Sequence, residues 1–273
     1  MNLNQLCEKI LLGTELQDKT FTFDLKFTDE FWIGSTTLNI EKPGRSKRLT
    51  FSEIQDKFPR AQSLKVDNMR GKALHFFANH ELLALEIMAY VLLKLPHKTH
   101  EEKRIKIGIL QTLSEEQKHF KLYLARMNEL GVEFGDFYLN QFFWAQTKDI
   151  NSFDEYFAIM ALTFENANLD FSSYYRDLFK EVGDQKSANI MQVVYDDEIG
   201  HVALGRNYLA KKSSPDLWDY YLKLLPEKLT PARAKGIAFD RTAREKAGFD
   251  TAFITKLENY KDEYRVTKRR QWE

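Results

Sequence analysis

The chain has 273 residues, 43% of them hydrophobic and 29% charged, which suffices for one large buried core or a core with a small additional lobe. Lysine plus arginine and aspartate plus glutamate both number 40, so no net charge draws the chain toward nucleic acid or an anionic membrane. The single cysteine, Cys7, excludes an intrachain disulfide and a metal site of four cysteines, and with the lack of an apolar targeting segment it predicts a cytoplasmic protein.

Residues 1–68 are predicted to form an N-terminal accessory segment. Residues 1–16 have the pattern of a short amphipathic helix, and residues 21–27 alternate apolar and polar side chains as a strand or an extended arm does. The basic cluster of Arg45, Lys47 and Arg48 follows a Pro-Gly turn signal, and we interpret it as a solvated loop rather than a phosphate site.

Residues 69–212 are predicted to form a bundle of four long helices. The first covers about 69–95 and the second about 100–130, where Gly131 is a suitable C-terminal cap. The third begins after the capping residue Ser152 and extends to about 181, and the fourth covers about 185–212. The aromatic-rich connection of about twenty residues between the two helical pairs is long enough for a crossover.

The C-terminal residues and the longest apolar run complete the predicted organisation of the chain. Residues 213–273 contain Pro215 and Pro231, which we expect to open shorter helices that pack on the bundle. The longest nearly apolar run, residues 81–95, contains Glu86 and is predicted to be too short and too charged to cross a bilayer.

The chemistry of the sequence is concentrated in two Glu-x-x-His pairs. Residues three positions apart share a helix face, so Glu198 and His201 converge, and Glu116 and His119 repeat the arrangement. Both pairs lie on apolar stripes, where buried polar groups require a partner. Two such pairs in one chain indicate a metal site.

Each pair is preceded by a helix with two acids in the pattern Glu-x-x-x-Leu-acid. The first run contains Glu81 and Glu86, and the second contains Glu165 and Asp170. The Glu of the next Glu-x-x-His follows 35 residues after Glu81 and 33 after Glu165, so the chain has the pattern of a duplicated helical hairpin. We expect the first acid of each run to face the metal and the second to support the site or to form a salt bridge, since both cannot point straight at the core.

Charge determines what such a bundle must contain. Four buried carboxylates without compensation would cost far more than the whole stability of a domain, which is about 10 kcal/mol. Two divalent cations cancel their charge, and a carboxylate and imidazole donor set suits iron or manganese without excluding zinc. The predicted ligands are Glu81, Glu116, His119, Glu165, Glu198 and His201.

Three neighbouring residues have predicted supporting roles. Glu115 and Asp197 each precede a ligand and are placed to accept the free ring N–H of the histidine in the opposite pair. Tyr195 lies one turn before Glu198 and is the candidate catalytic residue, because it could hydrogen-bond a ligand or carry a radical. A core tyrosine that donates to a carbonyl is the alternative interpretation.

At these residues the chain resembles the ferritin-like di-iron carboxylate superfamily. Within it the chain looks most like an uncharacterised bacterial ferritin-like family related to the di-iron tRNA hydroxylase, and residues 78–86, 164–170 and 234–249 carry that similarity. The resemblance implies an all-α, ferritin-like four-helix bundle with a long crossover, an N-terminal accessory lobe and extra C-terminal helices.

The resemblance also implies oxygen chemistry at two Fe ions, with Mn or a mixed Mn/Fe pair as variants. The expected activity is that of a dioxygen-dependent oxidoreductase, a monooxygenase or hydroxylase acting on an unidentified organic or tRNA substrate. Because the chain lacks the cysteine-ligated iron site of rubrerythrins, electrons would come from an external reductase or ferredoxin. We expect a monomer or dimer without membrane attachment rather than a storage cage.

Two functions of other classes remain open at the level of the sequence. One is iron or peroxide handling without an organic substrate, as in ferroxidases. The other is an RNA-binding or scaffolding bundle whose metal is purely structural. The first predicts a very large particle if it forms a cage, and the second predicts an unreactive zinc site.

Overall fold

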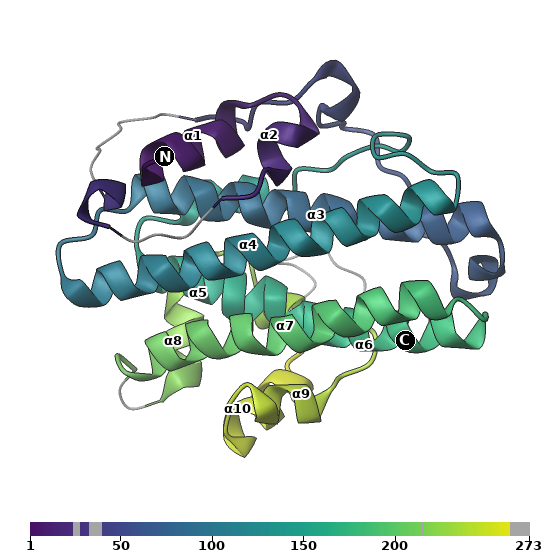
Figure 1. Ribbon diagram of the computed structural model, residues 1–273. Helices are drawn as coiled ribbons and strands as arrows, with labels where there is room; N and C mark the ends of the chain where they lie inside the picture. The colour runs from purple at the N-terminus through teal and green to yellow at the C-terminus, as the bar shows by residue number, and fades with distance from the viewer. Residues whose placement is uncertain (24–27, 33–39, 214–215, 263–273) are drawn as a thin grey trace. The chain divides into compact units, whose positions relative to one another are not determined.

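The computed structural model describes residues 1–23, 28–32, 40–213 and 216–262, and these residues form an all-helical protein (Figure 1). Within these ranges no strand occurs, and the sole strand-like pairing is an isolated bridge between Phe51 and Leu139. The chain separates into two compact units, residues 1–148 and 149–273. Each unit contains one of the two helical pairs that the sequence predicted.

The first unit is built on the hairpin of α3 (Asp67–Lys94) and α4 (His100–Glu129), which pack side by side (Figure 1). Thr99 caps α4, since its hydroxyl accepts from the Glu102 amide while the Glu102 carboxylate accepts from the Thr99 amide. The helix ends before Gly131, whose φ of +72° is the left-handed conformation that terminates many helices. The bounds of both helices agree with the predicted ones within two residues.

Helix α3 satisfies the length and composition of a membrane-spanning helix, which differs from the sequence-based expectation. The expectation considered only residues 81–95, whereas the helix has 28 residues and continues its apolar pattern toward its N-terminus. Of its most apolar window, 78% is buried inside the protein. This burial is typical of a helix in a protein core.

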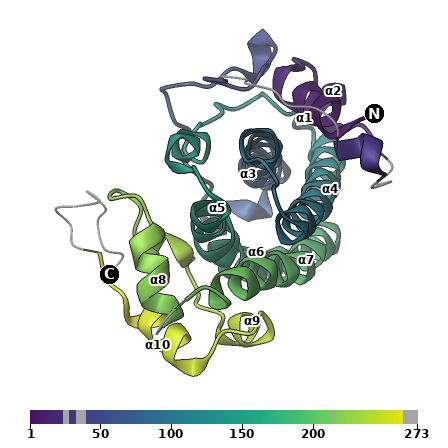
Figure 2. The ribbon, with the colours of Figure 1, turned by 90° about the vertical axis from the view of Figure 1, so that its left-hand side faces the viewer.

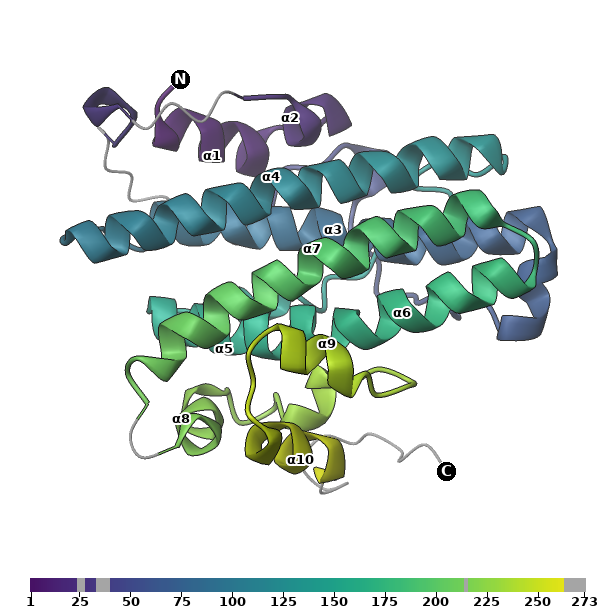
Figure 3. The same ribbon diagram turned by 60° about the horizontal axis from the view of Figure 1, so that its bottom comes forward.

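The N-terminal residues cover the hairpin of the first unit. Helix α1 (Leu3–Leu12), capped by Asn2, packs against α3, and the short α2 (Leu16–Thr20) contacts α4 (Figure 3). Residues 21–23 are not in a strand, and residues 24–27 of the predicted strand or arm lie outside the described residues. Three 3-10 turns follow, Asp29–Trp32, Lys47–Leu49 and Ala61–Lys65.

The aromatic connection after α4 packs along the first unit. Trp144 donates from its indole to the carbonyl of Glu41 at 2.8 Å, and Phe143 stacks on His80 with ring centroids 4.8 Å apart. His75 stacks on Phe134 and accepts from the amide of Gly135. A 3-10 helix, Trp144–Asp149, ends the connection. These contacts explain the aromatic content as packing.

The second unit contains α5 (Phe153–Ile159), the π-helix η5 (Met160–Glu165), α6 (Asn166–Glu181) and α7 (Gln185–Ala210). Helices α6 and α7 lie side by side (Figure 3). The sequence predicted one continuous helix over 152–181, and the structure differs by inserting the π-helix. Ser152 caps α5 as predicted, and Gly183, with φ of +81°, follows α6.

The π-helix packs closely against α7. A Cβ atom added at Gly205 would lie 2.3 Å from the Cβ of Ala161, so α7 can approach the π-helix only with glycine at this position. Thr163 Oγ1 donates to the carbonyl of Ala158, five residues earlier, and shares a 2.8 Å hydrogen bond with the Tyr221 hydroxyl.

The C-terminal residues of the second unit form short helices that pack on α5, α6 and α7 (Figure 2). They are α8 (Leu217–Leu224), the 3-10 turn η6 (Pro231–Ala234), α9 (Arg241–Lys246) and α10 (Thr251–Asn259). Pro231 opens the 3-10 turn, as its position in the sequence predicted. Residues 214–215, at the predicted start of the preceding helix, lie outside the described residues.

Candidate metal centre

The first unit brings Glu81 of α3 together with Glu116 and His119 of α4. None of the three residues is more than 4% exposed. His119 Nδ1 lies 3.4 Å from Glu116 Oε2 and 3.9 Å from Glu81 Oε2. One potential ligand atom from each residue lies within 4.8 Å of the others, close enough to surround a single ion. We call this group the first triad.

The two carboxylates of the first triad disfavour each other's ionisation. Burial raises the pKa of Glu81 well above its usual value, the negative charge of the Glu116 carboxylate raises it further, and His119 opposes both effects. A cation between the carboxylates would remove this repulsion and favour the ionised form of both.

In the second unit His201 lies close to both Glu198 and Glu165, and none of the three residues is more than 6% exposed. His201 Nδ1 lies 3.4 Å from Glu198 Oε2, the same separation as in the first unit, and ligand atoms of Glu165 and His201 lie within 4.8 Å. Asn168 donates from its side-chain amide to Glu198 Oε1 at 2.6 Å. We call Glu165, Glu198 and His201 the second triad.

The backbone at Glu165 is unusual, because this residue ends the π-helix η5. A π-turn adds a residue to the helical turn and rotates the residues that follow it relative to an α-helix. π-Helical segments are rare and concentrate at functional sites. The sequence did not predict this segment, since Met160–Glu165 has an ordinary helix-forming composition.

Glu86, the second acid of the first run, forms a salt-bridge cluster. Its carboxylate lies 3.2 Å from Lys19 Nζ and 2.5 Å from Arg45 Nη2, and all three side chains are buried. This is the salt-bridge alternative that the sequence left open for Glu86. The prediction of a solvated loop is wrong for Arg45, because a buried carboxylate required a cationic partner, whereas Arg48 is half exposed.

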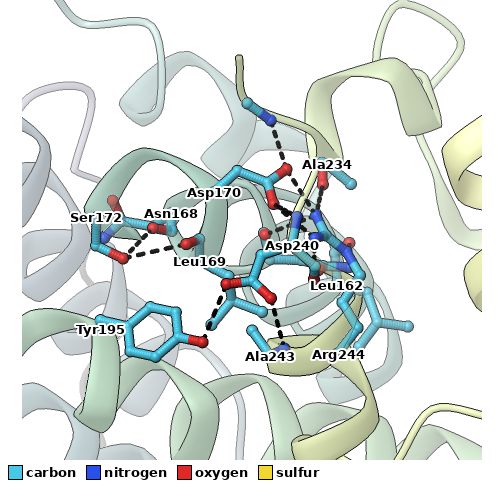
Figure 4. A network of polar contacts seen from close by, with 12 residues as sticks. Leu162, Asn168, Leu169, Asp170, Ser172, Tyr195, Ala234, Asp240, Ala243 and Arg244 are labelled. Atoms are coloured by element: carbon cyan, nitrogen blue, oxygen red, sulfur yellow. Dashed lines mark hydrogen bonds and ion pairs between the residues drawn. The ribbon is translucent and has the colours of Figure 1, made fainter. Parts of the chain in front are cut away.

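Asp170, the second acid of the second run, lies in a buried polar network (Figure 4). Arg244 donates to Asp170 Oδ1 at 2.6 Å and to Oδ2 at 2.9 Å, and neither side chain is exposed. The backbone amides of Gly236 and Asp240 also donate to this carboxylate, at 2.8 and 2.7 Å. Both oxygen atoms of the Asp170 carboxylate therefore accept hydrogen bonds from the C-terminal residues.

Arg244 holds several elements of the second unit together. Besides Asp170 it donates to the carbonyls of Asn166, Ala234 and Asp240, and its guanidinium lies 3.8 Å from the ring centroid of Phe239. No role was predicted for Arg244 from the sequence. The available signal was its place within residues 234–249, which together with residues 78–86 and 164–170 carried the family resemblance.

Tyr195, the predicted catalytic residue, donates its hydroxyl to Asp240 Oδ2 at 3.0 Å (Figure 4). Burial and the neighbouring Asp240 carboxylate raise the pKa of Tyr195 to about 12. Its partner is therefore a carboxylate rather than the carbonyl of the alternative interpretation. Glu115 and Asp197 are half buried, and their predicted contacts to histidines stay a prediction.

Each triad has the donors that a divalent metal requires. Two carboxylates balance one divalent charge, and a neutral imidazole adds a nitrogen ligand without adding charge. Oxygen and nitrogen donors without thiolate suit iron, manganese or zinc. The first triad can thus hold a metal ion, the second triad has the same types of donor, and the donor chemistry does not by itself select one metal.

Comparisons with known proteins match most of the chain. Over 144 residues, 51% of this chain and 49% of the relative, it is 28% identical to a protein of Haemophilus influenzae described as "Uncharacterized protein", so the chain spans about half of that relative's length. No solved structure matches. Residues 2–255 match a family described as "Protein of unknown function (DUF455)", and the chain belongs to this family.

Proposed function

We propose that this protein is a ferritin-like, non-haem di-metal oxidoreductase in which the two triads together bind a pair of metal ions. The observation that supports the proposal is the repetition of one buried donor set, two glutamates and a histidine with the same 3.4 Å Glu–His separation, in two units of one chain. Each set balances one divalent cation, so two sets balance a pair.

The residues of the two triads are the ligands that we propose for this pair. They are Glu81, Glu116 and His119 from the first triad and Glu165, Glu198 and His201 from the second. Burial excludes water and strengthens the attraction between carboxylate and cation. We propose iron as the metal, with manganese or a mixed pair as variants.

Bound in the ferrous state, the pair would supply the electrons that reduce dioxygen and the oxidising power for a monooxygenase or hydroxylase reaction. The chain's own cysteine is unsuited to an electron-transfer centre, because Cys7 is fully buried and burial raises the pKa of its thiol. We therefore propose an external electron donor, a reductase or ferredoxin.

The first experiment measures whether a metal pair forms. Metal-free protein is loaded with Mn²⁺ and studied by elemental analysis and electron paramagnetic resonance. The proposal predicts about two ions per chain whose spins couple. Fewer than two ions, or two ions with independent six-line spectra, would overturn the di-metal centre.

A pair of histidine variants provides the matched control. His119→Ala removes a proposed ligand and should lower the bound metal to about one ion per chain or less. His80→Phe changes another histidine of the same hairpin but keeps a ring to stack on Phe143, and it should leave the metal content unchanged.

The second experiment separates the possible chemistries. Anaerobic ferrous protein is mixed with dioxygen in a stopped-flow spectrometer, and a transient absorbance supports oxygen activation at the site. The absence of any transient in the ferrous protein would instead favour a structural metal. Gel filtration tests iron storage, because a storage cage would elute as a very large particle.

A further inference from the structure

The π-helix η5, which ends at Glu165, is joined to the C-terminal residues by two buried hydroxyl groups. Thr163 Oγ1 donates to the carbonyl of Ala158 at 2.8 Å, and this bond uses the single proton of the hydroxyl. In the 2.8 Å hydrogen bond between Thr163 Oγ1 and the hydroxyl of Tyr221 in α8, Tyr221 is therefore the donor. Thr163 and Tyr221 are fully buried, so water cannot replace either bond.

The bond from Thr163 to Ala158 fits the wide turn of a π-helix. In an α-helix a threonine hydroxyl bonds to the carbonyl three or four residues earlier, whereas Ala158 precedes Thr163 by five residues. The backbone shows the same spacing, because the amide of Asn166 donates to the carbonyl of Ala161. The Thr163 hydroxyl therefore favours the π-helix over an α-helix.

The π-helix determines the direction of the Glu165 side chain. Each residue of an α-helix adds a rotation of about 100° about the helix axis. The extra residue of a π-turn thus changes the direction of Glu165 relative to α5 by about that angle. Without the π-turn, Glu165 would no longer face His201, whose ligand atom lies within 4.8 Å of its own.

The contact of the π-helix with α7 links the same two ligands. Ala161 and Gly205 approach so closely that a Cβ atom added at Gly205 would lie 2.3 Å from the Cβ of Ala161. Glu165 follows Ala161 by four residues, and His201 precedes Gly205 by four, so each ligand lies about one turn from this contact. A shift of the π-helix against α7 would therefore change the distance between Glu165 and His201.

We propose that Tyr221 is a positioning residue for the metal centre, because through Thr163 it holds the π-helix in the register that directs Glu165 toward His201. This inference rests on the proposed function, in which Glu165 and His201 are ligands. Burial raises the pKa of Tyr221, so the hydroxyl keeps the proton that it donates. Loss of this donor would leave the π-helix without its hydrogen bond to α8.

The first measurement is a titration of the metal-free full-length protein with Co²⁺, followed by visible absorption, which reports the ligands and their geometry. Wild-type protein should bind two equivalents. Tyr221→Phe removes only the hydroxyl and should weaken the binding of at least one equivalent about 10-fold, the lower end of the effect of residues that orient metal ligands. The Co²⁺ absorption bands should also shift, because the direction of Glu165 changes.

Variants of Thr163 test whether Tyr221 acts through this residue. Thr163→Val keeps the shape without the hydroxyl and should weaken Co²⁺ binding at least as much as Tyr221→Phe. Thr163→Ser keeps the hydroxyl and should bind as the wild type does. The double variant Tyr221→Phe with Thr163→Val should bind no more weakly than Thr163→Val alone, because both changes remove the same bond.

Tyr220→Phe is the matched control on the same helix. It removes a hydroxyl that donates to Asp154 of α5 rather than to the π-helix. Co²⁺ affinity and absorption bands should both remain those of the wild type.

Hydrogen–deuterium exchange of the metal-free protein, followed by mass spectrometry, tests the hold on the π-helix without metal. In Tyr221→Phe the amides of residues 160–166 should exchange faster than in the wild type, because local opening costs less. The amides of residues 176–181, at the far end of α6, should keep their rates, and Tyr220→Phe should accelerate neither group.

The outcomes separate the inference from the proposed function. Two equivalents in the wild type with unchanged affinity and absorption bands in Tyr221→Phe would overturn the positioning role and leave the metal pair intact. Unchanged exchange of residues 160–166, additive effects of the Tyr221 and Thr163 changes, or an equal effect of Tyr220→Phe would overturn it as well. Fewer than two equivalents in the wild type would overturn the proposed function and the inference with it.

Discussion

The buried pair of Asp170 and Arg244 permits a quantitative prediction about the second unit. Replacement of Arg244 by methionine leaves the Asp170 carboxylate fully buried, with only the amides of Gly236 and Asp240 as donors (Figure 4). Loss of one partner of a buried ion pair costs about 3–5 kcal/mol, because the remaining charge lacks compensation. Three carbonyls also lose their guanidinium donor, so we expect the upper part of this range.

Urea denaturation followed by far-ultraviolet circular dichroism measures this loss. A change of 3–5 kcal/mol corresponds to a fall in Tm of roughly 6–20 °C for a chain of this size. Arg241→Ala is the matched control on the same helix, since Arg241 and Glu258 form an exposed pair of the kind that contributes less than about 1 kcal/mol.

A double-variant cycle isolates the interaction between the two side chains. If the pair is coupled as the structure shows, Asp170→Leu combined with Arg244→Met should be less destabilised than the sum of the single variants by about 2 kcal/mol or more. A cost below about 1 kcal/mol for Arg244→Met, or additive single effects, would refute this account of the network.

Three further predictions follow from other parts of the structure. Gly205→Ala should destabilise the protein by about 1–3 kcal/mol, because the new Cβ atom would overlap the π-helix. Gly200→Ala lies on the same helix with open space around it and should stabilise the protein by up to about 1 kcal/mol. Denaturant titrations measure both changes. Burial lowers the pKa of His75 to about 4 in the folded protein from 6.5, so the unfolded chain binds more protons between these values. The contribution of neutral His75 to the free energy of unfolding is therefore present above about pH 6.5 and is lost as the pH falls through 4. His75→Gln should flatten the pH dependence of the unfolding free energy in this window. An unchanged slope would contradict this prediction. Metal binding should release protons, because the raised pKa of Glu81 favours its protonated form in the metal-free protein. Calorimetry in buffers of different ionisation enthalpy measures this release, which should be smaller in Glu81→Gln.

The positions of the long helices could be read from the sequence because their signals are local. Periodic apolar residues, the Thr99 and Ser152 caps and the glycines after α4 and α6 act within one or two helical turns. The Glu-x-x-His spacing is equally local, since it places Glu116 beside His119 and Glu198 beside His201 on any α-helix.

Residues that are distant in the sequence determine which acid of each run belongs to a triad. Glu86 is engaged by Lys19 and Arg45, and Asp170 by Arg244, 74 residues further along the chain. Helix geometry predicted that only one acid of each run could face the metal. It could not identify the lysine and arginine side chains that form ion pairs with the other acid.

The sequence by itself determined the positions of the long helices and the two Glu-x-x-His pairs, because both follow from local patterns. Only the tertiary structure decided the π-helix before Glu165, the Asn168 contact to Glu198 and the Arg244 network. These features depend on side chains that meet across helices, such as Thr163 with Tyr221 and Gly205 with Ala161. The free energy of such contacts arises from packing and buried hydrogen bonds, which no local pattern of residues encodes.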